Sequence, residues 1–322
     1  MSNGEKLFSL IDQSRRILVI AHRRPDGDTT GSACAFLDYL LLKGKIARGF
    51  CIDIIPENLG FLLPETDIFF HDVYQLDLNS YDLIIAVDCG ELKQTGISEI
   101  LQNRPVKTLL INIDHHHTND YFGDMNIVES QASSTAEIVH NLFLQTGKIL
   151  SKRAINCLLT GILTDTTYFS NAATTSSAIK SASTLLEQGA KINQITQKIW
   201  QNKNLASLQL WGKIFERIIF NQETKTATAI ITKDDLDTPG LPDDSLEGIS
   251  NYLTSLADTK IVLVLMQIDD NTIKGSLRTT YDDVDVSEIA QRYGGGGHKK
   301  AAGFTTHGKI VFDDISWKIK TT

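Results

Sequence analysis

The sequence predicts an α/β fold, with an N-terminal, mainly parallel sheet flanked by helices and a smaller C-terminal α/β domain. First, short apolar runs alternate with helical patterns, as they do in parallel sheets. Second, 322 residues are enough for two domains of ordinary size, each with its own core. Third, three apolar runs end in Asp or His, and open α/β sheets bind ligands at the carboxyl ends of their strands. We therefore expect the site at that edge of the sheet.

The first half of the chain contains most of the predicted elements. A short helix over 5–15 leads into a strand at 17–21. After the loop 22–28, a helix runs from Thr30 to Gly44, because glycine suits the position just after a helix. The same reasoning predicts strands at 46–52, 81–87 and 107–113 and helices at 134–146, 151–163 and 176–188.

The pattern changes after residue 190. Residues 191–215 are helical in pattern and contain no candidate catalytic side chain, so we place the connection between the domains there. Beyond it we predict strands at 226–232, 261–268 and 272–280 and helices at 245–256 and 287–293. The predicted domains are therefore 1–190 and 216–322, with a cleft between them.

Composition and charge exclude several classes of protein. The net charge of −8 argues against a broad basic groove for long nucleic acid, but bound cations would still allow a short phosphorylated substrate. The four cysteines are widely spaced within apolar stretches, which is typical of reduced cytosolic proteins. The first residues do not show an apolar region behind a basic start, so we expect no signal peptide, and no stretch approaches the ~18 apolar residues of a membrane span. We expect a soluble cytoplasmic protein with no membrane partner.

Carboxylates and imidazoles follow the predicted strands. Each has an ordinary explanation: Asp28 could lie near an N-cap, Asp88 could belong to a turn, and Asp165 could cap the next segment. The run of histidines after Asp114 is harder to dismiss, because imidazoles that emerge from a buried strand usually form a ligand set. The candidate metal ligands are His22, Asp26, Asp28, Asp88, His115 and Asp165.

Together these side chains favour a pair of divalent cations. A mixed nitrogen and oxygen set without cysteine favours Mn²⁺, and Mg²⁺, Co²⁺ or Zn²⁺ would also suit it. Two ions about 4 Å apart can share a carboxylate and stabilise an in-line displacement at phosphorus. The sequence therefore predicts a phosphohydrolase site.

The motifs resemble those of the DHH family of phosphoesterases. They match in order, and the C-terminal Gly-Gly-Gly-His with Ala-Ala-Gly resembles the family's associated C-terminal domain, so the resemblance covers nearly the whole chain. It implies a catalytic domain with a dinuclear metal site over 1–190, a helical connector over 191–215 and a substrate-binding domain over 216–322. The matching segments are His22 to Asp28, Val87-Asp88-Cys89-Gly90, Asp114-His115-His116 and Thr164-Asp165.

The resemblance also implies a role for each matching residue. Asp88 would bridge the two ions. Asp114 would orient its neighbours, and His116 would contact the substrate phosphate. His117 lies outside the family triplet and receives no role. The remaining ligands would be His22 and Asp26 for one ion, and Asp28, His115 and Asp165 for the other.

Substrate-binding residues are expected mainly in the C-terminal half. A glycine run can be a flexible linker, but this one lies between a helix and a strand and precedes a histidine and two lysines, which favours anion binding. Arg278 resembles the family's substrate arginine, although it could be an exposed strand residue. Ser134 could touch substrate, but helix capping alone would explain it. The glycine-run candidates are Gly295, Gly296, Gly297 and His298.

The compact architecture resembles the family's oligoribonucleases that also dephosphorylate 3′-phosphoadenosine 5′-phosphate (pAp). This implies hydrolysis of RNA roughly two to five nucleotides long to mononucleotides, and of pAp to AMP. One alternative is a stand-alone phosphodiesterase for cyclic di-AMP or its linear product. A family II inorganic pyrophosphatase is disfavoured because its C-terminal domain lacks the Gly-Gly-Gly-His loop. A non-catalytic nucleotide-binding regulator is disfavoured by the intact set of acids. The natural substrate, the physiological metal and homodimer formation stay open.

Overall fold

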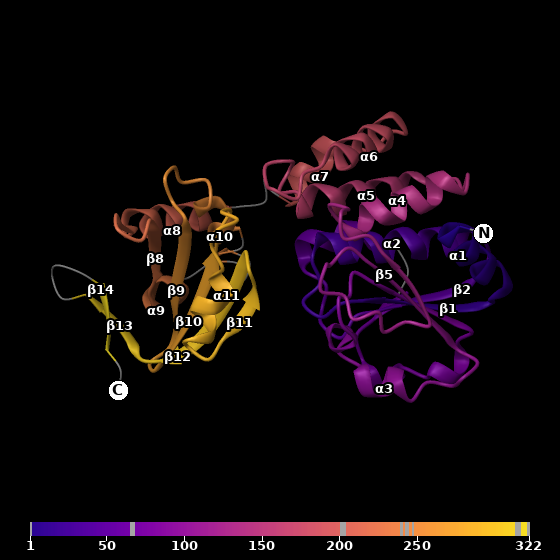
Figure 1. Cartoon of the computed structure of the whole chain (residues 1–322), viewed down its shortest axis with the longest axis horizontal. Helices are drawn as coiled ribbons and strands as arrows, with labels where there is room; N and C mark the ends of the chain where they lie inside the picture. Colours follow the sequence, from indigo (N-terminus) through magenta and orange to yellow (C-terminus); the bar gives the residue numbers. More distant parts are fainter. Residues whose placement is uncertain are drawn as a thin grey trace. The chain divides into compact units, whose positions relative to one another are not determined.

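The structure is a computed structural model that describes residues 2–64, 68–199, 204–238, 241, 245–246, 248–312 and 317–320, without the side chains of Asn251 and His298. The chain divides into two compact units, Met1–Asn202 and Lys203–Thr322 (Figure 1). The predicted connector, 191–215, contains the boundary between them. Its first helix, α7 (Ile192–Ile199), buries Ile195 in the first core, and its second, α8 (Leu205–Glu216), buries Leu210 and Ile214 in the second.

A parallel sheet forms the centre of the first unit, and this confirms the predicted α/β class. Its strands lie in the order β3-β2-β1-β4-β5-β6, and every neighbouring pair is parallel. Two short strands, β3 and β6, were not predicted. The strands are β1 (Arg16–Ala21), β2 (Ile46–Phe50), β3 (Phe69–Phe70), β4 (Leu83–Val87), β5 (Leu109–Asp114) and β6 (Met125–Val128).

Helices cover both faces of this sheet (Figure 1). Alternate strand residues point to opposite faces, so Ile17 and Val19 pack under the main helical layer while Leu18 and Ile20 belong to a second core that includes Leu101 of α3. The helices are α1 (Asn3–Gln13), α2 (Gly27–Leu42), α3 (Ser98–Gln102), α4 (Thr135–Gln145), α5 (Lys152–Asp165) and α6 (Ser176–Glu187). Short 3₁₀ turns are η1 (Glu57–Leu62), η2 (Val73–Gln75), η3 (Leu78–Ser80) and η4 (Leu92–Thr95).

Helix α2 is buried on nearly all sides because it lies between the sheet and α5. The two helices approach so closely that a Cβ at Gly31 would lie 2.4 Å from the carbonyl oxygen of Cys157. Glycine is therefore required at this crossing. Helix α2 begins at Gly27, three residues before the predicted start, because Asp26 provides its N-cap.

The chain reverses its direction of strand addition between β1 and β4. After β1 it adds β2 and β3 on one side, and it then continues with β4, β5 and β6 on the other. Ala21 and Val87, the last residues of β1 and β4, lie side by side. The residues that follow these strands, His22 and Asp88, therefore lie at a topological switch point of the sheet. Open α/β sheets bind ligands at such points.

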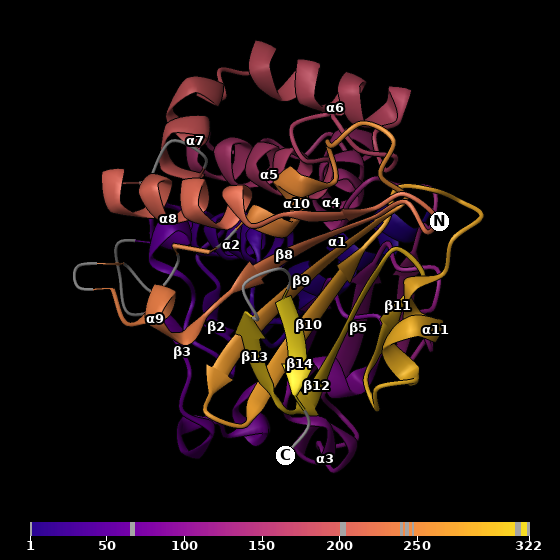
Figure 2. The ribbon, with the colours of Figure 1, turned by 90° about the vertical axis from the view of Figure 1, so that its left-hand side faces the viewer.

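The second unit contains a mixed sheet in the order β11-β12-β10-β9-β8-β7 (Figure 2). Helices α8 and α10 share a core on one face, and α11 packs on the other. The predicted helix over 245–256 is shorter in the described residues, and residue 247 lies outside them. The further elements are β7 (Ile219–Asn221), β8 (Thr226–Ile231), α9 (Lys233–Leu236), α10 (Ile249–Leu253), β9 (Ile261–Asp269), β10 (Thr272–Arg278), α11 (Val286–Gln291), β11 (Gly296–His298), β12 (Ala301–His307) and the hairpin β13 (Lys309–Phe312) and β14 (Trp317–Lys320).

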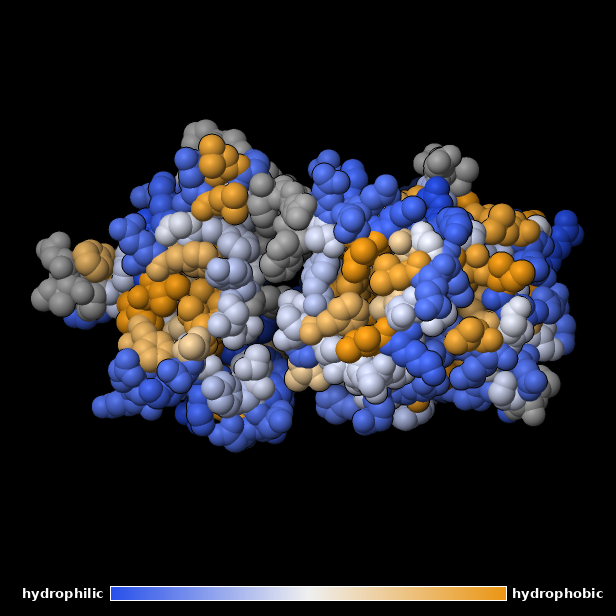
Figure 3. All heavy atoms as spheres, turned by 90° about the horizontal axis from the view of Figure 1, so that it is seen from above, coloured by the Kyte–Doolittle hydropathy of each residue, from blue (hydrophilic) through white to orange (hydrophobic). Residues whose placement is uncertain are grey.

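The outer surface of the helical layer carries apolar patches among polar side chains (Figure 3). Exposed residues of α4 and α6, namely Leu144, Ile179 and Leu186, are of this kind. Scattered apolar residues are normal on protein surfaces and do not by themselves indicate a partner. Within the described part of the chain, no helix combines the length and apolar character needed to cross a membrane.

Candidate metal centre

The loop after β1 places an imidazole against two acids. Asp26 Oδ1 accepts the amides of Asp28 and Thr29, both at 3.0 Å, so Asp26, rather than Asp28, caps α2. His22 Nδ1 lies 2.8 Å from the carbonyl oxygen of Arg23 and donates to it. This contact leaves Nε2 facing Asp26 Oδ2 at 3.7 Å and Asp88 Oδ2 at 3.3 Å.

Asp88 occupies the centre of the cluster. It follows β4 with a φ of 61°, a left-handed backbone that costs a non-glycine residue energy and is found preferentially at functional sites. Its amide is held by the carbonyl of Ile113 at 2.9 Å. Its two carboxylate oxygens face different imidazoles, because Oδ2 is near His22 and Oδ1 lies 3.6 Å from His115 Nε2.

Asp28 is fully buried and is held by the N-terminus of α4. Its two oxygens accept main-chain amides, Oδ2 from Thr135 at 2.7 Å and Oδ1 from Ala136 at 2.8 Å. A helix N-terminus favours negative charge, so this contact stabilises the buried carboxylate. A Cβ at Gly161 would lie 2.7 Å from Asp28 Oδ1, so glycine there lets α5 pass beside the acid.

His115 lies among three carboxylates. Its Nε2 is 3.3 Å from Asp165 Oδ2, 3.6 Å from Asp88 Oδ1 and 4.0 Å from Asp28 Oδ2. All six predicted metal ligands thus lie in one cluster. Among the described residues, three triads have donor atoms within 4.8 Å of one another: His22, Asp26 and Asp88; Asp28, His115 and Asp165; and Asp88, His115 and His116.

Burial and neighbouring charges shift the pKa values of the clustered acids and imidazoles. Burial raises the pKa of Asp28 well above its ordinary value, and the charges of Asp88 and Asp165 raise it further. Burial opposes the charge of His22, but the pairs with Asp26 and Asp88 prevail and raise its pKa to about 12. Burial would also raise the pKa of Asp88, yet the contact with His22 holds it below its ordinary value. Protons on the clustered side chains thus balance part of the negative charge of the carboxylates. A divalent cation bound to the same oxygen and nitrogen atoms would displace these protons.

Asp114 and His116 form a separate contact at the edge of the cluster. His116 Nδ1 donates to Asp114 Oδ1 at 2.7 Å, and Asn119 Nδ2 donates to Asp114 Oδ2 at 2.6 Å. Burial lowers the pKa of His116, but the bond to Asp114 outweighs it and raises the pKa to about 9. Asn119 was not predicted. The signal that could have found this network is Asn112, a polar residue inside a buried strand, whose side-chain oxygen also accepts from Asn119.

The donor chemistry suits a hard or borderline divalent ion. The triads offer carboxylate oxygens and imidazole nitrogens. Cys89 directly follows Asp88, but burial raises the pKa of its thiol and its Sγ contacts the carbonyl of Val87, so it does not present a thiolate. The cluster could therefore hold metal, and its composition fits Mn²⁺, Mg²⁺, Co²⁺ or Zn²⁺.

Ser134 lies beside this cluster as the N-cap of α4. It is fully buried, and its Oγ accepts the amide of Glu137 at 3.1 Å. Capping explains its presence, and its contact with substrate stays a prediction. The neighbouring Thr135 donates its hydroxyl to Asp88 Oδ1 at 2.9 Å.

Arg278 of β10 and His298 of β11, two of the predicted substrate residues of the second unit, lie on the strands that flank β12. Ala301 of β12 pairs with Arg278 on one side and His298 on the other, so these positions form one row across the sheet. The side chain of His298 lies outside the described part of the structure. The Arg278 guanidinium is partly buried, which lowers its pKa, and it donates to the carbonyl of Leu277 at 2.9 Å.

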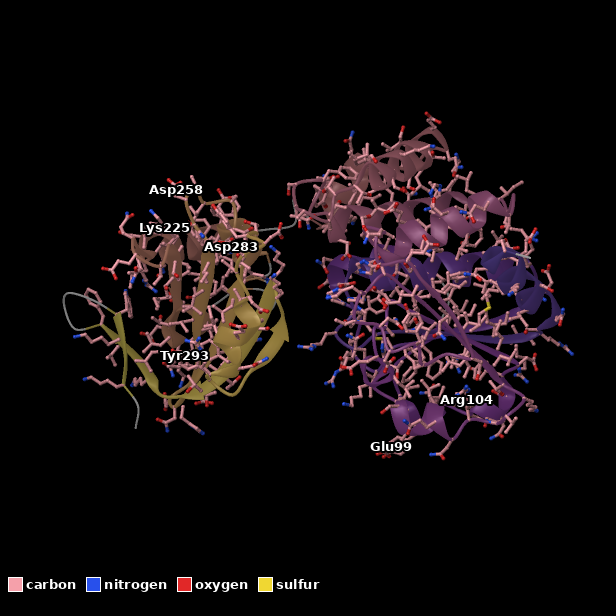
Figure 4. All side chains as sticks on the ribbon, in the orientation of Figure 1. Glu99, Arg104, Lys225, Asp258, Asp283 and Tyr293 are labelled. Carbon is pink, nitrogen blue, oxygen red and sulfur yellow. The ribbon has the colours of Figure 1, made fainter. Side chains whose placement is uncertain are left out.

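The last two residues of the glycine run, Gly296 and Gly297, belong to strand β11 and pair with β12, so this part of the run is not a flexible linker. At Gly295 a Cβ would meet Phe304, and Gly297 has a φ of 142°. Tyr293, labelled in Figure 4, precedes the run and stacks on Phe304 with ring centroids 4.7 Å apart. Gly296 differs from these, because a Cβ there would meet nothing within 4 Å. The fold thus explains two of the three predicted glycines and leaves open space at the third.

Comparison with known proteins agrees with this architecture. Residues 16–162 match the DHH family, N-terminal domain, and residues 224–321 match the DHHA1 domain. The chain is 30% identical over 293 residues to the Bifunctional oligoribonuclease and PAP phosphatase NrnA of Thermus thermophilus, covering 91% of this chain and 84% of that protein. It is 26% identical over 319 residues to the Bacillus subtilis protein of the same name, covering 98% and 97%.

A solved structure and a longer relative complete the comparison. The crystal structure of an exopolyphosphatase-related protein from Bacteroides fragilis superposes with a TM-score of 0.85 at 25% identity, covering 94% of this chain and 90% of that one. The Cyclic-di-AMP phosphodiesterase GdpP of Geobacillus thermodenitrificans is 29% identical over 308 residues, but these are 45% of its length.

The doubly wound sheet and its buried acid and imidazole cluster define a hydrolase of the phosphoesterase class. The chain belongs to the DHH family, with the DHHA1 domain as its C-terminal part.

Proposed function

We propose that this phosphoesterase hydrolyses short oligoribonucleotides, roughly two to five nucleotides long, to mononucleotides, and converts pAp to AMP. The observation that carries the proposal is the presence of two of the donor triads, His22-Asp26-Asp88 and Asp28-His115-Asp165, at the switch point of the sheet. The substrate class is supported by the Thermus thermophilus and Bacillus subtilis relatives, which align over most of their length. Buried, unpaired cysteines support a reducing cytoplasm as its compartment.

Two divalent cations, with Mn²⁺ favoured, are proposed as cofactors. Asp88 would be shared between them, because its oxygens face the imidazoles of both triads. When bound, the ions would polarise the phosphoryl oxygens and activate a water. The other ligands would be His22 and Asp26 for one ion, and Asp28, His115 and Asp165 for the other.

The remaining predicted residues would act on substrate. Asp114 holds the His116 ring through Nδ1, and we propose that this orients the imidazole toward the substrate phosphate. In the second unit we propose that Arg278 and His298 bind a terminal phosphate from their common row. The open space at Gly296 would allow the main chain to approach an anion, and Ser134, Gly295 and Gly297 would complete the substrate set.

Cyclic di-AMP hydrolysis is the second candidate. It is supported by the GdpP relative, which aligns with nearly the whole of this chain. The same metal cluster would serve that reaction, so substrate preference has to be measured directly.

Product analysis on a matched panel tests the proposal. Purified protein with Mn²⁺ would receive a 5′-phosphorylated diadenylate, a long RNA, pAp, cyclic di-AMP or pyrophosphate. We expect rapid conversion of the dinucleotide and pAp with the long RNA spared. Preference for cyclic di-AMP would replace the first candidate by the second. No turnover with metal still bound would favour a nucleotide-binding regulator.

A further inference from the structure

Thr135, the first residue of α4, contacts two of the clustered acids through two different groups. Its main-chain amide donates to Asp28 Oδ2 at 2.7 Å, and its hydroxyl donates to Asp88 Oδ1 at 2.9 Å. The residue is fully buried, so water does not compete for either contact. Thr135 therefore joins an acid at the start of α2 to the acid after β4.

The hydroxyl contact has a consequence for the orientation of Asp88. The terminal torsion of an aspartate has a broad, roughly two-fold preference, so the backbone alone does not determine which oxygen faces which neighbour. Asp88 Oδ1 accepts the hydrogen bond from the Thr135 hydroxyl. With Oδ1 held in this way, Oδ2 faces His22. The backbone of Asp88 is left-handed and does not have the extended geometry of a strand.

Thr135 is itself firmly held, as a positioning residue has to be. Ser134 caps the helix through the amide of Glu137, and the amides of Thr135 and Ala136 are tied to Asp28. A β-branched side chain also has few χ1 rotamers available in a helix. The hydroxyl is thus presented to Asp88 from a rigid support.

We infer that Thr135 is a positioning residue that sets the orientation of Asp88 and thereby the geometry in which two ions share it. The inference rests on the proposed function in one respect, because it takes Asp88 as the shared ligand. It does not depend on the substrate. Thr135 acts through the carboxylate and would touch neither the ions nor the phosphate.

Calorimetric titration of the full-length, substrate-free protein with Mn²⁺ tests this role. Thr135→Val keeps the shape and removes the donor, whereas Thr135→Ser keeps the donor and removes the methyl group. Thr160→Val is the matched control, because Thr160 is also fully buried but donates to Asn156 in its own helix. Circular dichroism in chelator verifies that each variant is folded.

We expect Thr135→Val to weaken Mn²⁺ binding about 10- to 100-fold, as is usual when a group that orients a ligand is lost. Thr135→Ser and Thr160→Val should stay close to wild type. Native affinity and stoichiometry in Thr135→Val would overturn the inference, and so would an equal loss in Thr135→Ser, which would point to packing of the methyl group.

The same titration separates this inference from the proposed function. A wild-type chain that binds no Mn²⁺ overturns both. A wild-type chain that binds Mn²⁺ but hydrolyses none of the panel overturns the proposed substrates, and the pattern of the Thr135 variants still supports or refutes the positioning role.

Discussion

Gly31→Ala should damage both stability and activity, because it forces α2 and α5 apart. The new Cβ would lie 2.4 Å from the Cys157 carbonyl oxygen, whereas ordinary contacts begin at 3.4 Å, so the helices must separate by about 1 Å. Asp28 lies three residues before Gly31 on the same side of α2, and Asp165 ends α5. Both acids face His115, so the separation pulls the triad open.

The magnitudes follow from two opposing effects. Overpacking costs about 1–3 kcal/mol, and the better helix propensity of alanine returns about 1 kcal/mol, which leaves a net loss of up to about 2 kcal/mol. In a unit of this size that lowers the melting temperature by up to about 8 °C. A displacement of about 1 Å in a catalytic centre can reduce kcat/KM about 100-fold.

Calorimetry and steady-state hydrolysis of pAp measure the two effects. Gly212→Ala is the control, because Gly212 lies within α8 and a Cβ there would meet nothing within 4 Å. It should stabilise the second unit by up to about 1 kcal/mol and leave activity unchanged. If Gly31→Ala were at least as stable as the wild type and had the native kcat/KM, the reasoning would be refuted. The two helices would then accommodate the new Cβ without cost.

Three further predictions concern single side chains. Asp88→Asn should reduce hydrolysis to background because it removes the shared negative ligand, and normal turnover by the Mn²⁺-saturated variant would contradict the two-metal assignment. Arg278→Lys should raise KM about 10-fold with little change in kcat, because an ammonium cannot make the planar two-point contact; an unchanged KM would remove Arg278 from the substrate site. Burial raises the pKa of Asp235, but bonds from Thr232 and the Arg217 guanidinium outweigh it and lower the pKa below its ordinary value. A depressed carboxyl pKa stabilises the fold above the unfolded pKa and loses that effect as pH falls, so Asp235→Asn should cost about 1–3 kcal/mol at pH 7 and progressively less below about pH 4. The measurement is the unfolding free energy of the wild type and of Asp235→Asn at several pH values. The same difference at every pH would exclude the Asp235 carboxylate as its origin.

The parallel sheet and the gathering of acids at its edge could be predicted because both depend on local sequence. The runs of β1 and β4 are continuous and apolar, and that of β5 is interrupted only by Asn112; each ends in polar residues that the sheet then brings together. Asp88 and His115 are thus recognisable from their positions after β4 and β5. Strand β3 is two residues long, so its pairing depends on the neighbouring strand and not on a pattern of its own.

The contacts that hold the acids in place could not be predicted in the same way. The bond from the Thr135 amide to Asp28 joins residues 107 positions apart and exists because α4 packs near the start of α2. Asn119 is close to Asp114 in sequence, but its role depends on how the following loop folds back. No spacing rule indicates either partner, because both are products of tertiary packing.

The left-handed backbone of Asp88 has an evolutionary consequence. Asparagine and glycine tolerate positive φ better than other residues, so few replacements are structurally acceptable at this position. Asparagine has nearly the same shape as aspartate, and its side-chain oxygen could still accept the Thr135 hydroxyl. A single nucleotide change that replaces aspartate by asparagine would therefore preserve the fold and remove the carboxylate that the two ions would share. A duplicated copy of this gene could become a non-hydrolysing nucleotide receptor by that single step.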